Sequence, residues 1–493
     1  MTVVADAFDE LQQRLGEALH ANRPGSDIDH VMVVLPSFSV GESTLAHYAA
    51  RIPSLEHRYL NALLIAGRIT DCHVVYISSR APDPAIVDYY VSVTPASGRD
   101  SLRSRLTLVD IDDGTVRSVA SKLLDHPERI EQIRRFIGDR PALIEGWNVT
   151  DMEVRLALAL GVPINGTRPE LRHLGFKSDG RRLIRRAGVP VPEGSEDVRS
   201  TDDVIKAVEA LREAHHARAG IVIKHDDSGA GDGNAVIDLG PMAVAPDPRG
   251  WLREQIEALP DWYRDDLARG GVVEERIGGD RFTSPSAQVD IRPDGRVIVL
   301  ATHEQVLGGE SGQVYLGCRF PADPVYAPRL AAHAAAIGEE LAREGAIGRF
   351  SVDFVAAADH GAAEWRVYAL EINLRKGGTT HPYAALRNIA PGRYDTGSGR
   401  WITEDGGTRC YSATDNLVDP AWLGLSPASV IATVADAGLQ FDPETGTGVV
   451  LHMLSGLTID GRFGLTAIGE TPEAAARMHD ATRAAVAALV MVR

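Results

Sequence analysis

A strand–turn–strand segment over residues 351–373 constrains the fold more strongly than any other part of this chain. Residues 351–355 and residues 365–373 each alternate apolar and polar side chains, which is typical of strands buried on one face. The Asp-His-Gly sequence at residues 359–361 favours a turn between them. The segment therefore predicts an antiparallel β-hairpin with one apolar face and one polar face.

Three oxygen-bearing side chains share the polar face of this predicted hairpin. If the turn centres near Ala362, Asp353 pairs opposite Glu371, and Asn373 lies on the same face as Glu371. Two neighbouring carboxylates repel each other and lose hydration in such a place, and a divalent cation removes that conflict. Because Mg²⁺ prefers oxygen ligands, we predict that Asp353, Glu371 and Asn373 bind it. The alternative at this point is a surface hairpin with solvated charges.

A glycine-rich loop lies between two further stretches with β-like sequences. Residues 221–224 and 235–239 flank the loop, so it is predicted to be a hairpin tip and not a strand-to-helix turn. Backbone N–H groups in such a tip can approach phosphate oxygens. We predict nucleotide contacts at Ser228, Gly229, Gly231 and Gly233. A flexible turn without a ligand is the alternative.

The chain contains only five lysines, whereas arginine supplies nearly all of the other basic residues. A lysine kept against this bias suggests a chemical role. Lys224 ends the strand before the glycine loop and can direct a compact charge at a phosphate. Arg375, two residues after Asn373, can neutralise a phosphoryl oxygen on the side of the predicted metal site. We therefore predict Lys224 and Arg375 as catalytic residues.

The length of 493 residues exceeds what one hydrophobic core usually serves, so several domains are expected. Short apolar runs at residues 30–35, 74–78 and 142–145 alternate with helical stretches, which predicts an open α/β domain up to residue 165. Residues 220–380 are strand-rich, and residues 400–493 have a separate β/α pattern that predicts a small C-terminal domain or lid. The fold class is therefore α/β, with α+β character.

Composition argues against several classes of protein. The net charge of −17 disfavours a nucleic-acid-binding surface, which needs a basic stripe. The three cysteines are far apart, so a disulfide framework or a cysteine zinc site is not expected and a reducing, cytoplasmic location fits. The acidic, amphipathic start does not resemble a signal peptide, and the longest apolar run, residues 484–492, is too short to cross a bilayer. No membrane partner is expected.

In their chain order, these motifs resemble the ATP-grasp superfamily of carboxylate–amine ligases. The resemblance covers about residues 140–385 and includes Leu-Gly-Phe-Lys at residues 174–177, the glycine loop, the hinge-like strand at residues 272–277 and the carboxylate hairpin. It implies ATP and Mg²⁺ as cofactors, with Lys177 and Lys224 binding the nucleotide phosphates. It also implies that Arg375 steadies an acyl phosphate.

The same resemblance implies further nucleotide contacts. Glu274, Glu275 and Ile277 correspond to the hinge strand that holds the adenine edge. Asp280 stands near the place where the family often has a glutamate for the ribose hydroxyls, although here the sequence reads Gly-Asp-Arg at residues 279–281. The implied division is a pre-ATP-grasp domain at 1–165, a small subdomain with the glycine flap at 166–270, a metal and adenine subdomain at 271–395 and a C-terminal domain or lid at 396–493.

The N-terminal region and the tail more specifically resemble peptide ligases of the pheganomycin type. That resemblance implies an amino-acid carboxylate donor, nonproteinogenic in kind, and a peptide N-terminal amine as acceptor, in natural-product (antibiotic) biosynthesis. Two alternatives stay open at this point: a ligase with a non-peptide amine acceptor, and a non-catalytic ATP-binding sensor. The sequence does not decide between a monomer and a homodimer.

Overall fold

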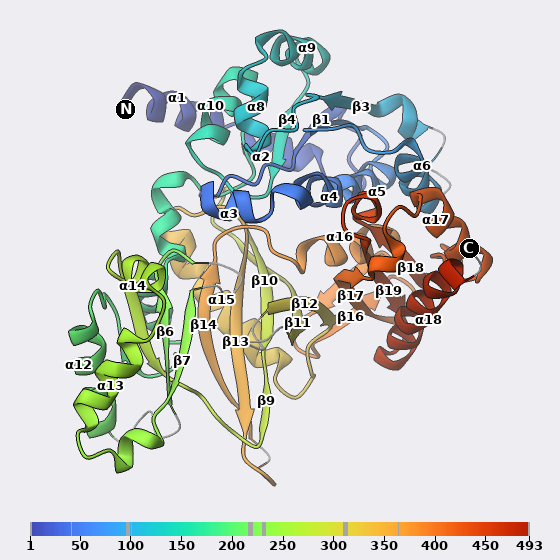
Figure 1. Ribbon diagram of the computed structural model, residues 1–493. Helices are drawn as coiled ribbons and strands as arrows, with labels where there is room; N and C mark the ends of the chain where they lie inside the picture. Colours follow the sequence, from blue (N-terminus) through green and yellow to red (C-terminus); the bar gives the residue numbers. More distant parts are fainter. Residues whose placement is uncertain are drawn as a thin grey trace.

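The computed structural model describes residues 2–40, 42–94, 99, 101–214, 220–228, 233–308, 314–362 and 364–491. The strands of the described residues form three sheets (Figure 1). In Figure 1 the N-terminal sheet lies at the top, the small sheet with its helices at the lower left, and the last helices at the right. Both α-helices and β-strands build the molecule, as expected for the α/β class.

The N-terminal sheet is parallel, with the strand order β3-β2-β1-β4. All six residues of β1 are buried, because helices cover both faces of a parallel sheet and exclude water from the strands between them. Its strands are β1 (His30–Leu35), β2 (Cys72–Ser78), β3 (Leu106–Asp110) and β4 (Ala142–Gly146). Its helices are α1 (Thr2–Gln12), α2 (Leu15–Ala21), α3 (Glu42–His47), α4 (Ile52–His57), α5 (Ala62–Arg68), α6 (Pro84–Val93), α8 (Val119–Leu124), α9 (Pro127–Ile137) and α10 (Asp151–Leu160), with the 3₁₀ turns η1 (Ala49–Arg51), η2 (Arg58–Asn61) and η3 (Arg103–Arg105).

The small sheet has the order β5-β8-β6-β7 and contains the predicted glycine-loop hairpin. β6 and β7 pair antiparallel, which confirms that the loop joins two strands. The strands are β5 (Gly194–Ser195), β6 (Gly220–His225), β7 (Asn234–Asp238) and β8 (Gly271–Glu275), and the neighbouring helical elements are η4 (Pro169–Gly175), α11 (Lys177–Arg186), α12 (Thr201–Glu213), η5 (Pro241–Val244), α13 (Pro248–Glu257) and α14 (Asp261–Leu267). Because β8 pairs with β5 and β6, this sheet extends to residue 275, past the subdomain boundary expected at residue 270.

The large central sheet has eleven strands, with β14-β13-β10-β11-β12-β17-β16-β15 in sequence along its main path. Its strands are β9 (Arg281–Thr283), β10 (Pro285–Ile291), β11 (Val297–Gly308), β12 (Val314–Phe320), β13 (Gly348–Ala358), β14 (Arg366–Asn373), β15 (Gly392–Asp395), β16 (Arg400–Thr403), β17 (Thr408–Val418), β18 (Gly448–His452) and β19 (Arg462–Gly469). The helical elements of this half are α15 (Ala327–Arg343), α16 (Thr380–Ile389), η6 (Pro420–Trp422), α17 (Pro427–Asp436), η7 (Leu454–Thr458) and α18 (Pro472–Met491).

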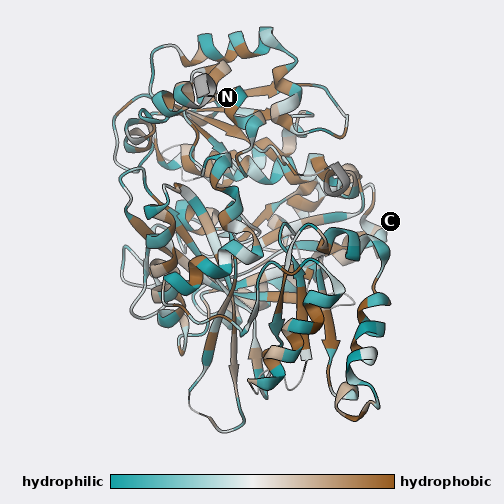
Figure 2. Cartoon of the chain, turned by 90° about the vertical axis from the view of Figure 1, so that its left-hand side faces the viewer, coloured by the Kyte–Doolittle hydropathy of each residue, from teal (hydrophilic) through white to brown (hydrophobic). Residues whose placement is uncertain are grey.

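The C-terminal strands continue the central sheet and do not form a sheet of their own. β17 pairs with β12 on one side and with β19 on the other, so the segment expected as a separate small domain shares hydrogen bonds with the centre of the molecule. In Figure 2, hydrophobic residues concentrate in the interior of the molecule and hydrophilic residues on the outer helices. Among the described residues, no helix is long and apolar enough to cross a membrane.

Helix α15 packs against the apolar face of the central sheet. Leu330, Ala334, Ile337 and Leu341 follow a helical spacing, and they pack with Val289 of β10 in one buried cluster. The sheet residues on the opposite face are therefore free to carry polar side chains.

We expect Ile337→Ala to lower the free energy of unfolding by about 2–5 kcal/mol, because it leaves a cavity under the central sheet. Urea denaturation followed by circular dichroism measures this change. Val325→Ala, at a side chain that is 66% exposed next to the same helix, is the control and should change stability by less than about 0.5 kcal/mol. Equal effects of the two changes would contradict the packing role of α15.

Candidate nucleotide and metal site

The β13–β14 hairpin has the predicted register. Asp353 pairs opposite Glu371 and Ser351 pairs opposite Asn373, with a bulge between Asp353 and Phe354. Opposite residues of an antiparallel pair project to the same face, and so do residues two apart along a strand. The hairpin therefore brings Asp353, Glu371 and Asn373 together, as the sequence pattern predicted.

The other face of the hairpin is apolar and fixes this orientation. Val352, Phe354 and Ile372 are buried in the same cluster as α15. A register slip of one residue would expose these three side chains and bury the carboxylates on the helix side. Burial of the apolar face thus determines which way Asp353 and Glu371 point.

Amide groups hold the two carboxylates. Asn373 donates from Nδ2 to Asp353 Oδ2 at 2.9 Å and to Glu371 Oε1 at 3.1 Å. Gln305 of β11 donates from Nε2 to Asp353 Oδ1 at 2.7 Å. No sequence motif indicated Gln305, because its strand β11 is separated from Asp353 of β13 by the intervening strand β10.

Electrostatics at the two carboxylates are unequal. Burial and the neighbouring charge of Glu371 raise the pKa of Asp353 to about 7. Burial also acts to raise the pKa of Glu371, but the charge of Lys177 outweighs it and lowers that pKa. The pair therefore has one carboxylate that ionises readily and one that does not, which is the conflict that a divalent cation relieves. Two carboxylates and an amide, whose oxygen and nitrogen can exchange by a flip, fit the oxygen preference of Mg²⁺.

Both predicted phosphate lysines are buried and engaged by carboxylates. Lys177, the first residue of α11, places Nζ 2.6 Å from Glu371 Oε2. Lys224 forms an ion pair with Glu274, and Arg181 of α11 binds the second oxygen of Glu274 at 2.6 Å. Lys177 thus reaches the central hairpin from the small-subdomain side, while Lys224 stays within the small sheet.

The glycine loop begins beside Lys177. Lys177 donates from Nζ to the backbone oxygen of Ser228 at 3.2 Å, so the start of the loop contacts the same ammonium that contacts Glu371. At Gly233 an added Cβ would lie 2.5 Å from the Ser228 Cβ, so a side chain there would force the two ends of the loop apart. Gly229 and Gly231 lie outside the described residues, and their nucleotide contacts stay predictions.

The expected adenine and ribose residues fall in different places. Glu274 is buried in β8, whereas Glu275 and Ile277 are half-buried where the chain leaves the small sheet for β9. Asp280 is exposed and accepts a hydrogen bond from the backbone N–H of His360, at the turn of the hairpin. The neighbouring Arg281 pairs with Ala358, five residues and roughly 17 Å along the strand from Asp353. The structure therefore does not bring Asp280 to the carboxylate cluster.

Arg375 lies where the N-terminal domain meets the central sheet. Its guanidinium carbon stands 4.9 Å from the ring centre of Trp147, and the Trp147 ring packs against Phe38 at 5.0 Å. The next residue, Lys376, pairs with Glu145 at the end of β4. Trp147 follows the end of β4, and ligands often bind at such strand ends in α/β domains. The structure places it against Arg375.

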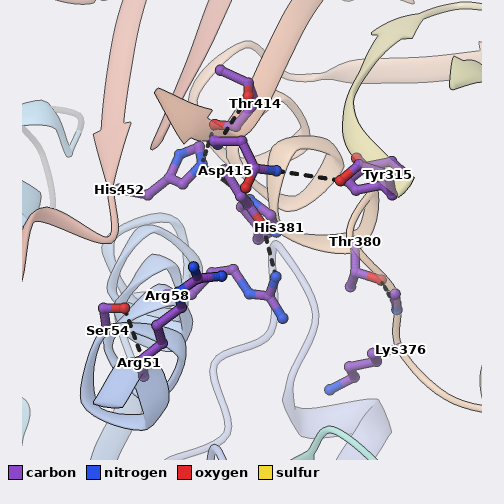
Figure 3. Close-up of polar contacts among 12 residues, drawn as sticks. Arg51, Ser54, Arg58, Tyr315, Lys376, Thr380, His381, Thr414, Asp415 and His452 are labelled. Carbon is purple, nitrogen blue, oxygen red and sulfur yellow. Dashed lines mark hydrogen bonds and ion pairs between the residues drawn. The ribbon is translucent and has the colours of Figure 1, made fainter. Parts of the chain in front are cut away.

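A second polar cluster, which no sequence motif indicated, lies beyond the loop at residues 374–379. His381, Asp415 and His452 are buried and approach one another, and Arg58 of η2 pairs with Asp415 (Figure 3). Burial lowers the pKa of His381 to about 3, although Asp415 acts against this shift. These residues come from four separate elements, so no spacing in the sequence indicated them. His303 is a separate buried histidine, and its Nε2 lies 2.6 Å from the Tyr411 hydroxyl.

Comparisons with known proteins identify the family. The chain is 32% identical over 470 residues to L-propargylglycine–L-glutamate ligase of Streptantibioticus cattleyicolor, which covers 93% of this chain and 94% of that protein. Residues 260–395 match the family model "IQCH-like, ATP-grasp", and residues 429–482 match the "PGM1 C-terminal domain". The chain belongs to the ATP-grasp superfamily. It is an enzyme of the ligase class, as the sequence predicted.

Solved structures agree on the fold of this ATP-grasp ligase. An ADP complex of purK, an N5-carboxyaminoimidazole ribonucleotide synthetase, superposes with a TM-score of 0.53 at 13% identity, covering 92% of this chain and 96% of that one. The biotin carboxylase domain of 2-oxoglutarate carboxylase from Hydrogenobacter thermophilus, solved with MgADP, gives 0.52 at 14% identity, covering 92% and 89%. The expected ATP-grasp fold is therefore confirmed.

Because the pKa of Asp353 is raised to about 7, we expect Mg²⁺ binding by this ligase to weaken as the pH falls. Below that pKa a proton must leave Asp353 before the cation binds, so the apparent Kd should rise by up to about tenfold per pH unit. Calorimetric titration of Mg²⁺ at several pH values, with a fixed ATP analogue, measures the slope. Asp353→Asn should bind more weakly and without this slope, whereas a pH-independent Kd in the unaltered protein would contradict the assignment.

Proposed function

We propose that this ATP-grasp ligase activates an amino-acid carboxylate as an acyl phosphate and transfers the acyl group to the amine of a peptide or amino acid. The observation that carries the proposal is the pairing of Asp353 with Glu371 next to Lys177. This pairing supports the proposal because two carboxylates that suit a hard cation lie beside a lysine that could bind a phosphate. Asp353, Glu371 and Asn373 would hold Mg²⁺, which would neutralise charge on the nucleotide phosphates.

In the first step, an oxygen of the donor carboxylate attacks the γ-phosphorus, and the bond from that phosphorus to the β-phosphate oxygen breaks to release ADP. Lys177, which is paired with Glu371 in this structure, then contacts the nucleotide phosphates. Arg375 stabilises the negative charge on the phosphoryl group during its transfer. The glycine flap, which starts at Ser228 beside Lys177, closes over the nucleotide and excludes water from the acyl phosphate.

In the second step, the acceptor amine attacks the acyl carbon, the carbon–oxygen bond to phosphate breaks, and the amine nitrogen loses a proton. No side chain need form a covalent bond, because positioning of the two substrates supplies much of the rate. Lys224 holds the nucleotide, for which it must exchange its contact with Glu274 for a phosphate. Glu274, Glu275 and Ile277 line the adenine edge where the chain passes from β8 to β9.

The proposed substrate classes rest on the similarity to the Streptantibioticus ligase and on the resemblance to peptide ligases of the pheganomycin type. The Streptantibioticus ligase is named for two α-amino acids, L-propargylglycine and L-glutamate. We propose a nonproteinogenic amino acid as donor here and a peptide N-terminus as acceptor. An amide-product screen by mass spectrometry, with free amino acids and short peptides in parallel, separates these acceptors. Whether the enzyme works as a monomer or a homodimer stays a separate prediction.

Asp353→Asn and Glu371→Gln should each abolish ADP release with an active carboxylate–amine pair, because each removes a metal-binding charge. A coupled ADP assay measures the rate, and circular dichroism checks the fold. Asp359→Asn is the matched control, since this exposed carboxylate lies at the turn of the same hairpin and pairs with the exposed Arg366. Normal ADP release by both site variants would remove the metal-site assignment.

Arg375→Ala should lower the rate of ADP release by about 100-fold or more, because one cation aimed at developing charge is lost. The control is Arg366→Ala, at a half-exposed arginine at the other end of β14, which should keep the rate within about twofold. The same assay decides the sensor alternative, because a sensor would bind ATP tightly and release no ADP with any carboxylate–amine pair.

A further inference from the structure

The cluster of His381, Asp415 and His452 has the composition of a transition-metal site. His381 Nε2 and His452 Nε2 each lie 2.8 Å from the same atom, Asp415 Oδ1. The two nitrogens lie 3.2 Å from each other. Three ligand atoms from α16, β17 and β18 therefore form a small triangle, as Figure 3 shows.

The size of this triangle is close to one face of a zinc coordination tetrahedron. With zinc–nitrogen and zinc–oxygen distances of about 2.0–2.1 Å, neighbouring ligands of a tetrahedral site lie roughly 3.3 Å apart. The separation of the two imidazole nitrogens matches this value, and Asp415 Oδ1 would move outward by about half an ångström. No change of backbone path is needed to reach that geometry.

Burial and the second contact of Asp415 also favour a metal. The side chains of His381, Asp415 and His452 are only 7%, 12% and 4% exposed, so the ligands are already desolvated and ordered. Arg58 Nη1 holds Asp415 Oδ2 at 2.7 Å, which leaves Oδ1 to face the two imidazoles. Such an outer contact fixes the direction of a ligating carboxylate.

We propose that His381, Asp415 and His452 bind a zinc ion, separate from the magnesium site at Asp353 and Glu371. Two imidazoles and one carboxylate suit Zn²⁺, whereas Mg²⁺ prefers oxygen ligands throughout. Among the described residues, no fourth histidine, cysteine, aspartate or glutamate joins the group, so the fourth position takes water or a substrate group.

The metal would brace the loop that carries Arg375. His381 is the second residue of α16, and the loop before it holds Arg375 and Lys376. Zinc at His381 would tie the end of this loop to β17 and β18, and through Arg58 to the N-terminal domain. Removing the metal should therefore loosen the C-terminal strands as well as the loop.

The decisive experiment measures zinc in the full-length protein. The protein is stripped with a chelator, dialysed against micromolar Zn²⁺ in the presence of excess Mg²⁺, and analysed by inductively coupled plasma mass spectrometry. We expect about one zinc per chain, a fall to below about one fifth of that in His452→Gln, and no change in His303→Gln, a buried histidine outside the cluster. The double variant Asp353→Asn/Glu371→Gln should keep its zinc, which separates this site from the magnesium site.

Cobalt gives a second measurement that needs no variant. Co²⁺ added to the stripped protein should produce the intense visible absorption of tetrahedral coordination, and stoichiometric Zn²⁺ should remove it. Less than about a tenth of a zinc per chain, or cobalt spectra of octahedral type only, would overturn the proposal. The cluster would then be a hydrogen-bonded network in which both imidazoles donate to Asp415. Loss of zinc from the double variant but not from His452→Gln would also overturn it.

Discussion

Two carboxylates that face each other across paired strands are the constraint on which the rest of this structure depends. Asp353 and Glu371 cannot both be ionised and buried without a compensating cation, and the hairpin register holds them together. Cationic and amide side chains from several elements contact the two carboxylates. They are Lys177 from α11, Asn373 from the hairpin itself, and Gln305 from β11, two strands away in the sheet. Because these side chains come from different subdomains, their contacts with Asp353 and Glu371 hold the subdomains together.

Buried ion pairs also join the N-terminal domain, the central sheet and the C-terminal strands next to the site. Glu145 at the end of β4 pairs with Lys376, and Arg58 of η2 pairs with Asp415 of β17. Both pairs are largely buried, so separating the N-terminal domain or the C-terminal strands would leave charges without partners in a poorly solvated place. Arg375 lies over the ring of Trp147, so its position depends on contact between the N-terminal domain and the central sheet.

Local patterns predicted the features that are local in the fold. The alternation along residues 351–355 and 365–373 sufficed for the hairpin and its register, because a strand has a period of two and only one register buries Val352, Phe354 and Ile372. The glycine loop was likewise predicted as a hairpin tip. The ribose contact of Asp280, which the family resemblance implied, stays a prediction. The turn into β9 brings this side chain to the turn of the hairpin, where it accepts a hydrogen bond from the backbone N–H of His360.

The sequence alone determined the class of fold and the carboxylate hairpin, because these depend on side-chain periodicity over short stretches of the chain. Lys177 was indicated only by the resemblance to the ATP-grasp superfamily, since it lies far from Glu371 in the sequence. Only the tertiary structure decided that β17 joins β12, that Gln305 reaches Asp353, and that His381, Asp415 and His452 meet. Such contacts join segments separated by tens to hundreds of residues. Their formation is governed by which apolar faces pack together, and that is a property of the whole chain that no local spacing encodes.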